Sequence, residues 1–242
     1  GTAGDYQNIP FLQACRLLKY EDKLPVLFVH VVYVPIPKHL GEAKTKPVQH
    51  SVRFLWEMGI APDIIVCRSE KPVDDVRKKK ISTFCNISRK DIFSSPDAQT
   101  VYEMPLILEE QGLATRILKA FNMKSEEPDL ELWKTLIEKM KKASKTIRVA
   151  MVTKYIKSGA FELADSYVSV NEALKHAATH LGVKVKIKWV DAQEVEKDIS
   201  ILKNCDGIIV PGGFGKTGIE GKIQASKYAR ENNVPYLSLI HI

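Results

Sequence analysis

The feature that most restricts the fold of this chain is an apolar run that leads into a polar loop containing lysines. The run, residues 27–34, is rich in β-branched and aromatic residues, which favours a buried strand. The loop, residues 41–50, follows the carboxyl end of that strand. Because ligands bind at the carboxyl ends of strands in open α/β sheets, the pattern predicts an α/β fold with a ligand site in this loop.

The loop has the side chains of an anion site. Lys44 and Lys46 are two residues apart, so in an extended loop both ammonium groups point the same way. Thr45 and Gln49 add neutral hydrogen-bonding groups, and this set suits a polyphosphate. The alternative is a solvated loop followed by a helix that begins at Ser51, and the spacing alone does not decide between them.

Short apolar runs and segments of helical spacing alternate along the rest of the chain. The helix expected at residues 51–58 ends at a glycine signal, Gly59. Asn8 and Pro10 are start signals for the first helix. We expect further strands at residues 62–67, 92–93, 147–152, 183–190 and 207–210, and further helices at residues 8–18, 73–84, 166–180 and up to Gly112.

The pattern predicts two α/β domains joined by a linker. Residues 122–146 change in character, with a polar start followed by one amphipathic helix. We therefore expect a first domain at residues 1–121, a linker at 122–146 and a second domain at 147–242.

The charge balance favours a small acidic ligand over nucleic acid. The chain has 36 Lys and Arg against 29 Asp and Glu, a net charge of +7. The basic clusters at residues 38–46, 77–80 and 139–145 lack the interleaved aromatic residues of a single-strand nucleic-acid platform. We expect no nucleic-acid partner.

The cysteines and the hydropathy pattern favour a cytoplasmic protein. The cysteines form no C-x-x-C pair, so we expect no zinc site, and their apolar neighbourhoods predict buried thiols in a reducing compartment. No apolar run approaches the ~20 residues of a membrane span, and no signal peptide is recognisable, so we expect no membrane partner. The cysteines are Cys15, Cys67, Cys85 and Cys205.

Two glycine segments are candidates for close backbone contact with a ligand. The strand expected at residues 207–210 runs into Pro211, Gly212, Gly213, Phe214 and Gly215. Their amides, free of side chains at three positions, suit an oxyanion hole, and a tight turn is the alternative. The chain also opens on a glycine turn, residues 1–5, beside the first helix, which ordinary turn geometry explains equally well.

Six segments match the patterns of one family, in order, along nearly the whole chain. Residues 1–5 match G-T-V-G-D, 41–51 match G-E-x-K-T-K-P-T-Q-H-S, and 67–70 match C-R-S-[DE]. Residues 80–85 match K-I-S-x-F-C, 165–178 match D-A-Y-x-S-V-x-E-A-L-x-H-A, and 205–223 match C-D-G-I-L-V-P-G-G-F-G-x-R-G-x-E-G-K-I. The chain therefore resembles the cytidine triphosphate (CTP) synthases.

The resemblance implies a fold and an activity. The fold is a truncated P-loop-type parallel-sheet amidoligase domain, followed by a truncated class I glutamine amidotransferase α/β domain. The implied reaction is the ATP-dependent amination of UTP to CTP, in which ATP phosphorylates the uracil O4 and ammonia from glutamine displaces the phosphate. Mg²⁺, activation by GTP and a homotetramer are further implications.

The resemblance also implies roles for matched residues. One residue, Asp97, belongs to the ATP side, within a Pro96-Asp97-Ala98 segment that reads Lys-Asp-Val in the family. The glutamine and oxyanion site would be Gly212, Gly213, Phe214 and Gly215. The UTP or CTP site would comprise Asp5, Tyr6, Gln7, Lys44, Thr45, Lys46, Pro47, Val48, Gln49 and Lys80. Three of these positions differ from the family pattern, which has Ile-Glu at Tyr6-Gln7 and Thr at Val48; Thr153-Lys154-Tyr155 replaces Gly-Lys-Tyr.

The remaining expectations concern the ends of the chain. We expect the family's phosphate loop and magnesium carboxylates upstream of Gly1. Ile240 stands where the family has its nucleophilic cysteine, so we expect no catalytic residue and no metal ligand in this chain, and neither half-reaction from it alone. Residues 237–242 resemble a translated sequencing adaptor. The alternative function is a non-catalytic nucleotide-sensing or filament-forming module.

Overall fold

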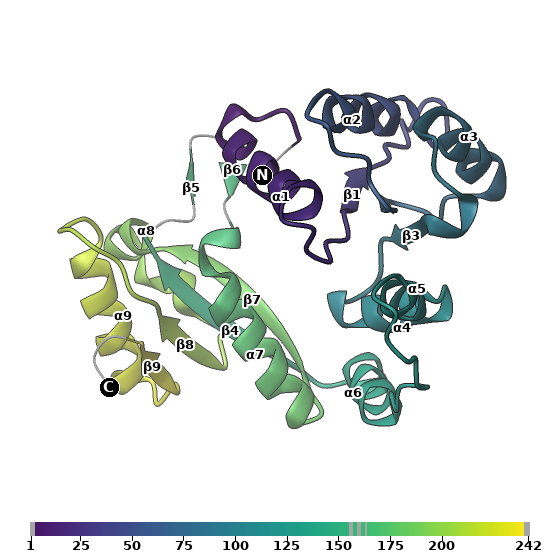
Figure 1. The fold of residues 1–242 in the computed structure, drawn as a ribbon. Helices are drawn as coiled ribbons and strands as arrows, with labels where there is room; N and C mark the ends of the chain where they lie inside the picture. Colours follow the sequence, from purple (N-terminus) through teal and green to yellow (C-terminus); the bar gives the residue numbers. More distant parts are fainter. Residues whose placement is uncertain (1–2, 155–156, 159–160, 163, 240–242) are drawn as a thin grey trace. The chain divides into compact units, whose positions relative to one another are not determined.

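The structure is a computed structural model that describes residues 3–154, 157–158, 161–162 and 164–239 (Figure 1). It divides into two compact units, Gly1–Leu130 and Glu131–Ile242. The helix expected in the linker thus falls within the second unit, and the finer domain boundaries stay a prediction. The expectations for Gly1, Thr2, Tyr155 and residues 240–242 lie outside the described residues.

The first unit is built on a parallel sheet, as the sequence predicts. Its strands β1 (Val29–Tyr33), β2 (Ile64–Ser69) and β3 (Ile92–Pro96) lie in the order β1-β2-β3. Helix α2 (Lys46–Glu57) connects β1 to β2, and helix α3 (Asp75–Cys85) connects β2 to β3. All three strands therefore end at the same edge of the sheet.

Helices cover both faces of this sheet, although unequally. Helices α2 and α3 lie beside one another in Figure 1 and pack on one face through a buried apolar cluster. On the other face, α4 (Met104–Glu110) and α5 (Leu113–Ala120) pack on β2 and β3. The cluster beneath α2 and α3 comprises Val32, Val34, Val48, Val52, Ile65, Cys67, Val73, Ile81, Cys85 and Ile92.

The prediction that the first strand is buried is wrong for one of its faces. Val31 is 65% exposed and Tyr33 is 62% exposed, while Val32 is buried. The register pairs Val31 with Val66 of β2, so the exposed side chains share the face that α4 and α5 cover on β2 and β3. Those helices do not extend over β1 within the described residues.

Helix α2 begins five residues earlier than the helix expected at Ser51. Its first residue is Lys46, with Thr45 at the N-cap position and Pro47 in the first turn. The prediction of an extended loop, in which Lys44 and Lys46 point the same way, is therefore wrong. Thr45, between them, already has helical dihedral angles, φ −86° and ψ −7°. The helix ends as predicted before Gly59, which has φ +74°.

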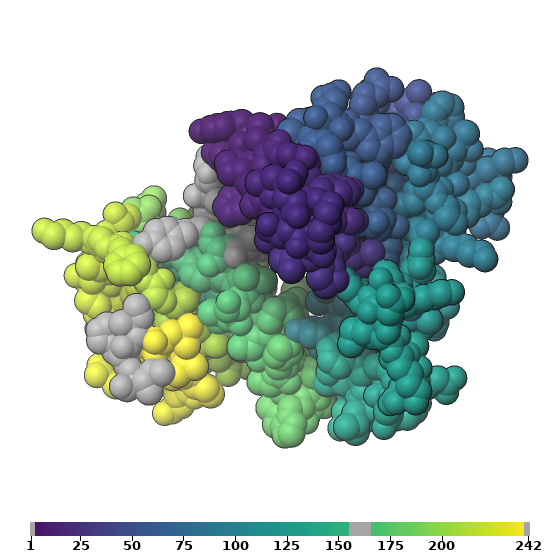
Figure 2. Space-filling view, in the orientation of Figure 1, coloured from purple at the N-terminus to yellow at the C-terminus, as the bar shows by residue number. Residues whose placement is uncertain are grey.

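The amino-terminal helix of the first unit lies largely at the surface. The 3-10 helix η1 (Tyr6–Asn8) leads into α1 (Ile9–Tyr20), which has Pro10 in its first turn and no buried residue. Asn8 holds the N-cap position, but its side chain makes no capping hydrogen bond. In the space-filling view, this purple segment forms part of the surface of the first unit (Figure 2). The remaining short helices of this unit are η2 (Arg89–Asp91) and η3 (Val101–Glu103).

The second unit contains a second parallel sheet in the order β7-β4-β8-β9. The first three of its strands agree with the sequence prediction in position and type. The side-chain burial of β7 alternates as predicted. The strands are β4 (Thr146–Thr153), β7 (Lys184–Asp191), β8 (Gly207–Val210) and β9 (Tyr236–Ser238), and β5 (Lys157–Ser158) pairs antiparallel with β6 (Phe161–Glu162).

Helices lie on both faces of the second sheet. Helix α7 (Val168–His180) follows η4 (Ala164–Tyr167) and packs along β7, as Figure 1 shows. The other face is covered by α8 (Ala192–Lys197), η5 (Ile199–Leu202) and α9 (Ile219–Glu231), whose apolar side chains join Ala150, Val152, Val190, Ile208 and Val210 in one cluster. Helix α6 (Glu131–Lys142) packs against α7.

The prediction of buried cysteines holds for two of the four. Cys67 and Cys85 are buried, which raises the pKa of Cys67 to about 12 and that of Cys85 to about 11, so both are thiols at neutral pH. Cys15 is exposed because α1 has no buried face, and Cys205 is half-buried. The sequence around Cys15 is apolar, but its helix is not covered by the rest of the unit.

We predict that His30 makes the first unit less stable in mild acid. Its Nε2 lies 2.8 Å from Oγ of Ser51, and burial lowers the pKa of His30 below its usual value. The unfolded chain, with a His pKa of about 6.5, therefore binds more protons, and stability falls as the pH drops through that value. Urea unfolding at pH 7.5, 6.5 and 5.5 should show a steeper loss for the wild type than for His30→Gln. Parallel losses would contradict this.

We predict that Gly221→Ala destabilises the second unit by at least about 1–3 kcal/mol, because the added methyl group does not fit between helices α9 and α8. A Cβ at Gly221 would lie 1.8 Å from the carbonyl oxygen of Ala192, where α9 crosses the start of α8. The control is Gly207→Ala, whose Cβ would lie 3.7 Å from the Pro235 oxygen. Thermal unfolding should separate the two variants, and equal melting temperatures would sink the packing argument.

Candidate functional site

The glycine segment of the second unit lies at the carboxyl edge of its sheet. Strands β4 and β8 are parallel neighbours, with Met151 paired to Ile209, so Lys154 and Pro211 both follow strand ends at that edge. A cavity of about 620 Å³ opens there. Its lining residues are Lys154, Val210, Pro211, Gly212, Gly213, Gly215, Ile219, Lys222, Ile223, Ser226, Tyr236 and Ser238.

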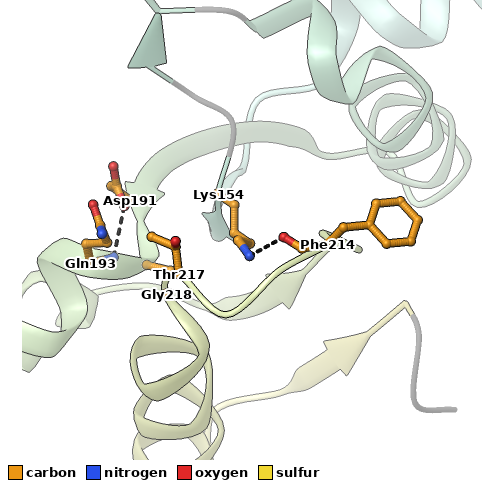
Figure 3. Close-up of a pocket in the computed structure, with 7 residues that line it drawn as sticks. Lys154, Asp191, Gln193, Phe214, Thr217 and Gly218 are labelled. Carbon is orange, nitrogen blue, oxygen red and sulfur yellow. Dashed lines mark hydrogen bonds between the residues drawn. The ribbon is translucent and has the colours of Figure 1, made fainter.

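The Lys154 ammonium group holds two carbonyl groups of the glycine segment. Its Nζ donates to the carbonyl oxygen of Gly215 at 2.6 Å and also to that of Phe214 (Figure 3). The stem of Lys154 passes close to the segment, since a Cβ at Gly213 would lie 2.8 Å from its Cδ. Only glycine leaves room for this approach without a shift of the lysine side chain.

A second lysine holds the start of the segment. Nζ of Lys222, at the first turns of α9, donates to the carbonyl oxygen of Pro211 at 3.1 Å. Burial lowers the pKa of Lys222, and the nearby charge of Lys154 lowers it further. Neither lysine was assigned a role from the sequence, although Lys154 is the matching lysine of the Gly-Lys-Tyr pattern and Lys222 lies in the matching segment 205–223.

These two contacts fix the orientation of backbone amides. In a trans peptide the N–H points opposite to the C=O of the same peptide unit. Anchoring the Pro211 oxygen therefore sets the direction of the Gly212 N–H, and anchoring the Phe214 oxygen sets that of the Gly215 N–H. Preorganised N–H groups of this kind stabilise a developing negative charge.

Phe214 differs from the three glycines around it. Its side chain is 91% exposed, and its ring points away from Lys154 in Figure 3. Phe214 lines a second cavity, of about 240 Å³. The other residues of that cavity are Lys154, Asp191, Ala192, Gln193, Thr217 and Gly218.

The candidate anion loop of the first unit is tied together by ion pairs. The Glu42 carboxylate accepts from Lys44 at 2.6 Å and from Arg77 of α3 at 2.9 Å. These neighbours, Lys44 first, lower the pKa of Glu42. Part of the positive charge assigned to the loop is therefore already compensated, and Arg77 of the basic cluster at residues 77–80 contacts the loop through Glu42.

The other predicted residues of this site divide into exposed and buried groups. Lys46 is exposed, with Nζ 5.5 Å from the ring centre of Phe84, one helical turn after Lys80 on α3. Thr45 and Gln49 are buried and hydrogen-bonded to each other at 3.1 Å. The structure thus brings Lys46 close to the helix face that carries Lys80, and Lys80 is also exposed.

The remaining residues of the predicted nucleotide site lie nearby or apart. Gly4, next to Asp5, and Pro47 line one cavity of about 410 Å³, while Val48 is buried in the core. Tyr6 and Gln7 are exposed on η1. Asp97 follows β3 and pairs with Arg68 at 2.6 Å.

The described residues contain neither a cluster of metal ligands nor a membrane-spanning helix. Among the residues that the structure describes, no three side chains of His, Cys, Asp or Glu lie together as metal ligands. Within the same residues, no helix is both long and apolar enough to cross a membrane.

Comparisons with known proteins identify the family of the chain. Residues 1–123 match the family model described as CTP synthase N-terminus, and residues 162–239 match glutamine amidotransferase class-I. The CTP synthase of Thermococcus gammatolerans is 48% identical over 241 residues, which are 99% of this chain and 44% of that protein. For the CTP synthase of Sulfurisphaera tokodaii the identity is 48% over 245 residues, or 100% and 45% of the two chains.

Among solved structures, the Trypanosoma brucei CTPS glutaminase domain with bound acivicin is 38% identical, with a TM-score of 0.34. That match covers 38% of this chain and 35% of the other. The chain spans about 44% of the length of the curated relatives that it matches. With the first family model matching more than half of its residues, the chain belongs to the CTP synthase family.

Proposed function

We propose that the protein containing this chain converts UTP to CTP, with ATP as the activating substrate and glutamine as the nitrogen source. The observation that carries the proposal is the glycine segment, whose carbonyl groups are held by Lys154 and Lys222 beside a cavity of about 620 Å³. Family membership and the class-I amidotransferase match support glutamine as the ligand of that cavity.

The chain's own residues have a defined task in glutamine hydrolysis. Attack on the side-chain amide carbon of glutamine turns the carbonyl oxygen into an oxyanion. The N–H groups of Gly212 and Gly215 would donate to that oxygen, in orientations set by the two lysines. Because those lysines bind carbonyl groups of the protein, their task is to position the amides, and neither acts as a proton donor.

The first unit would hold the phosphate chain of UTP, or of CTP as the product. Lys46 and Lys80 supply exposed positive charge from two neighbouring helices. Lys44 would join them once its pair with Glu42 opens, while Thr45 and Gln49 hold the first turn of α2 together. Asp5, Tyr6 and Gln7 would contact the ribose or base from the neighbouring turn.

The proposal also includes the ligands and the oligomeric state that family membership implies. ATP would bind near Asp97, GTP would activate glutamine hydrolysis, and the protein would act as a cytoplasmic homotetramer. The described residues do not fit a magnesium site, because they bring no three candidate ligands together.

We predict that Lys46→Ala weakens UTP binding by about 1–3 kcal/mol, the loss of one charge-assisted contact. Calorimetric titration of UTP into the chain measures this. Lys124→Ala is the matched control, because it removes an equal charge from an exposed position of the same unit. Unchanged affinity in Lys46→Ala would contradict the assignment of this helix start to the phosphate chain.

We predict that Lys154→Met weakens glutamine binding at least tenfold, about 1.4 kcal/mol, and shifts the amide resonances of Gly212, Gly213 and Gly215. The methionine keeps most of the apolar stem but cannot donate to Phe214 and Gly215. Lys216→Met is the control, since it removes an exposed lysine from the same segment. Equal affinities for the two variants would show that the lysine contacts do not prepare the site.

A further inference from the structure

A strongly basic pocket in the second unit lies apart from the glycine segment. It encloses about 450 Å³ and carries cations from β4, from β7 and from the segment before β8. The residues around it are Arg148, Lys186, Ile187, Lys188, Lys203, Asn204 and Cys205. The volume is within the range of about 300–1,000 Å³ that small-molecule sites occupy.

The pocket is at the opposite end of β4 from the glycine segment. Arg148 is near the amino end of the strand, and Lys154 follows its carboxyl end, six residues later. At about 3.3 Å per residue, the two backbone positions are roughly 20 Å apart. The pocket is therefore a separate site, and no residue with a proposed role in binding UTP or glutamine lines it.

Strand geometry places three of the cations on one face. Arg148 and Lys186 are register partners in the parallel pair β4–β7, and Lys188 is two residues beyond Lys186. Side chains two apart on a strand point to the same face. Like charges opposite each other on a sheet destabilise it, so the folded chain gathers these cations against their mutual repulsion.

The described residues offer little negative charge in return. Lys188 donates to the carbonyl oxygen of Ile201, and no hydrogen bond or ion pair reaches the side chains of Arg148, Lys186 or Lys203 within the described part of the chain. Asp206 is an acidic neighbour, and its carboxylate accepts from the backbone N–H of Arg148 at 2.7 Å. Asp198 is a second acidic neighbour: hydrogen bonds from Ser200, and in addition the charge of Lys203, lower the pKa of its carboxyl. Four cations and two carboxylates leave a net charge of about +2.

We propose that this pocket binds the phosphate chain of a small molecule, a di- or triphosphate. A guanidinium group and several ammonium groups match the charge and the acceptor oxygens of such a chain, and Asn204 adds an amide. No aromatic side chain lines the pocket among the described residues, so there is no surface on which a base stacks. The phosphate chain, and not a base, is the recognised group.

Calorimetric titration of pyrophosphate and tripolyphosphate into the chain, at fixed ionic strength, tests the proposal. A Lys46→Ala background removes the lysine proposed to bind phosphate in the first unit, so this test succeeds or fails independently of the proposed function. The pocket variant is Lys186→Gln with Lys188→Gln. The control is Lys139→Gln with Lys197→Gln, which removes the same charge from exposed helical positions of the same unit outside the pocket.

We expect the pocket variant to lose at least tenfold in affinity and the control less than threefold. A parallel titration with UTP distinguishes the source: an equal loss indicates the phosphate chain of a nucleotide, and a loss confined to the inorganic anions indicates free pyrophosphate. Equal losses in the pocket and control variants, or no binding by the unsubstituted pocket, would overturn the proposal. Lys203→Gln, on the adjoining loop, provides a second variant should the double variant fail to fold.

Discussion

The hydrogen bonds from the Lys154 ammonium group to two backbone carbonyl groups organise the glycine segment on which the candidate glutamine site depends. Glycine removes the side chains that would block the cavity, but it also leaves the backbone free to adopt many conformations. A positively charged donor beneath the segment restricts that freedom. A Cβ at Gly213 would lie 2.8 Å from Cδ of Lys154, so a side chain there would force the lysine stem to shift.

The first unit uses charge in a comparable way. Glu42 joins Lys44 to Arg77, so the loop before α2 is tied to α3 before any ligand arrives. The pair Thr45–Gln49 secures the first helical turn from within. Lys46 and Lys80 are exposed, so in the proposed site the residues that would contact the phosphate chain differ from those that hold the loop and the helix start together.

The order and type of the main strands could be predicted from the sequence, because buried parallel strands are short and continuously apolar, as in β2. The predictions of burial that were wrong concern residues whose exposure depends on elements distant in the sequence. The exposure of Val31 and Cys15 follows from which elements cover β1 and α1, and no local sequence pattern carries that information. The early start of α2 had a local signal, since proline favours the first helical turn and Pro47 occupies it.

The candidate sites show the same limit. The glycine segment could be located from the sequence because Pro-Gly-Gly after a strand is distinctive, but the roles of Lys154 and Lys222 could not, since a lysine's task depends on where its ammonium group lies. An ammonium group bonded to carbonyl groups orders the backbone.

Both ends of β4 carry cations, yet their surroundings give them different chemistry. At the carboxyl end, the charge of Lys154 faces carbonyl dipoles, so it is partly compensated within the protein. Near the amino end, Arg148 and Lys186 lie side by side without such partners in the described chain. Under the two proposals, compensation by the backbone would order the segment that binds glutamine, and its absence would leave a field that attracts anions. One parallel sheet can thus carry compensated cations at the carboxyl ends of its strands and uncompensated cations near the amino ends, because the length of the strand separates them.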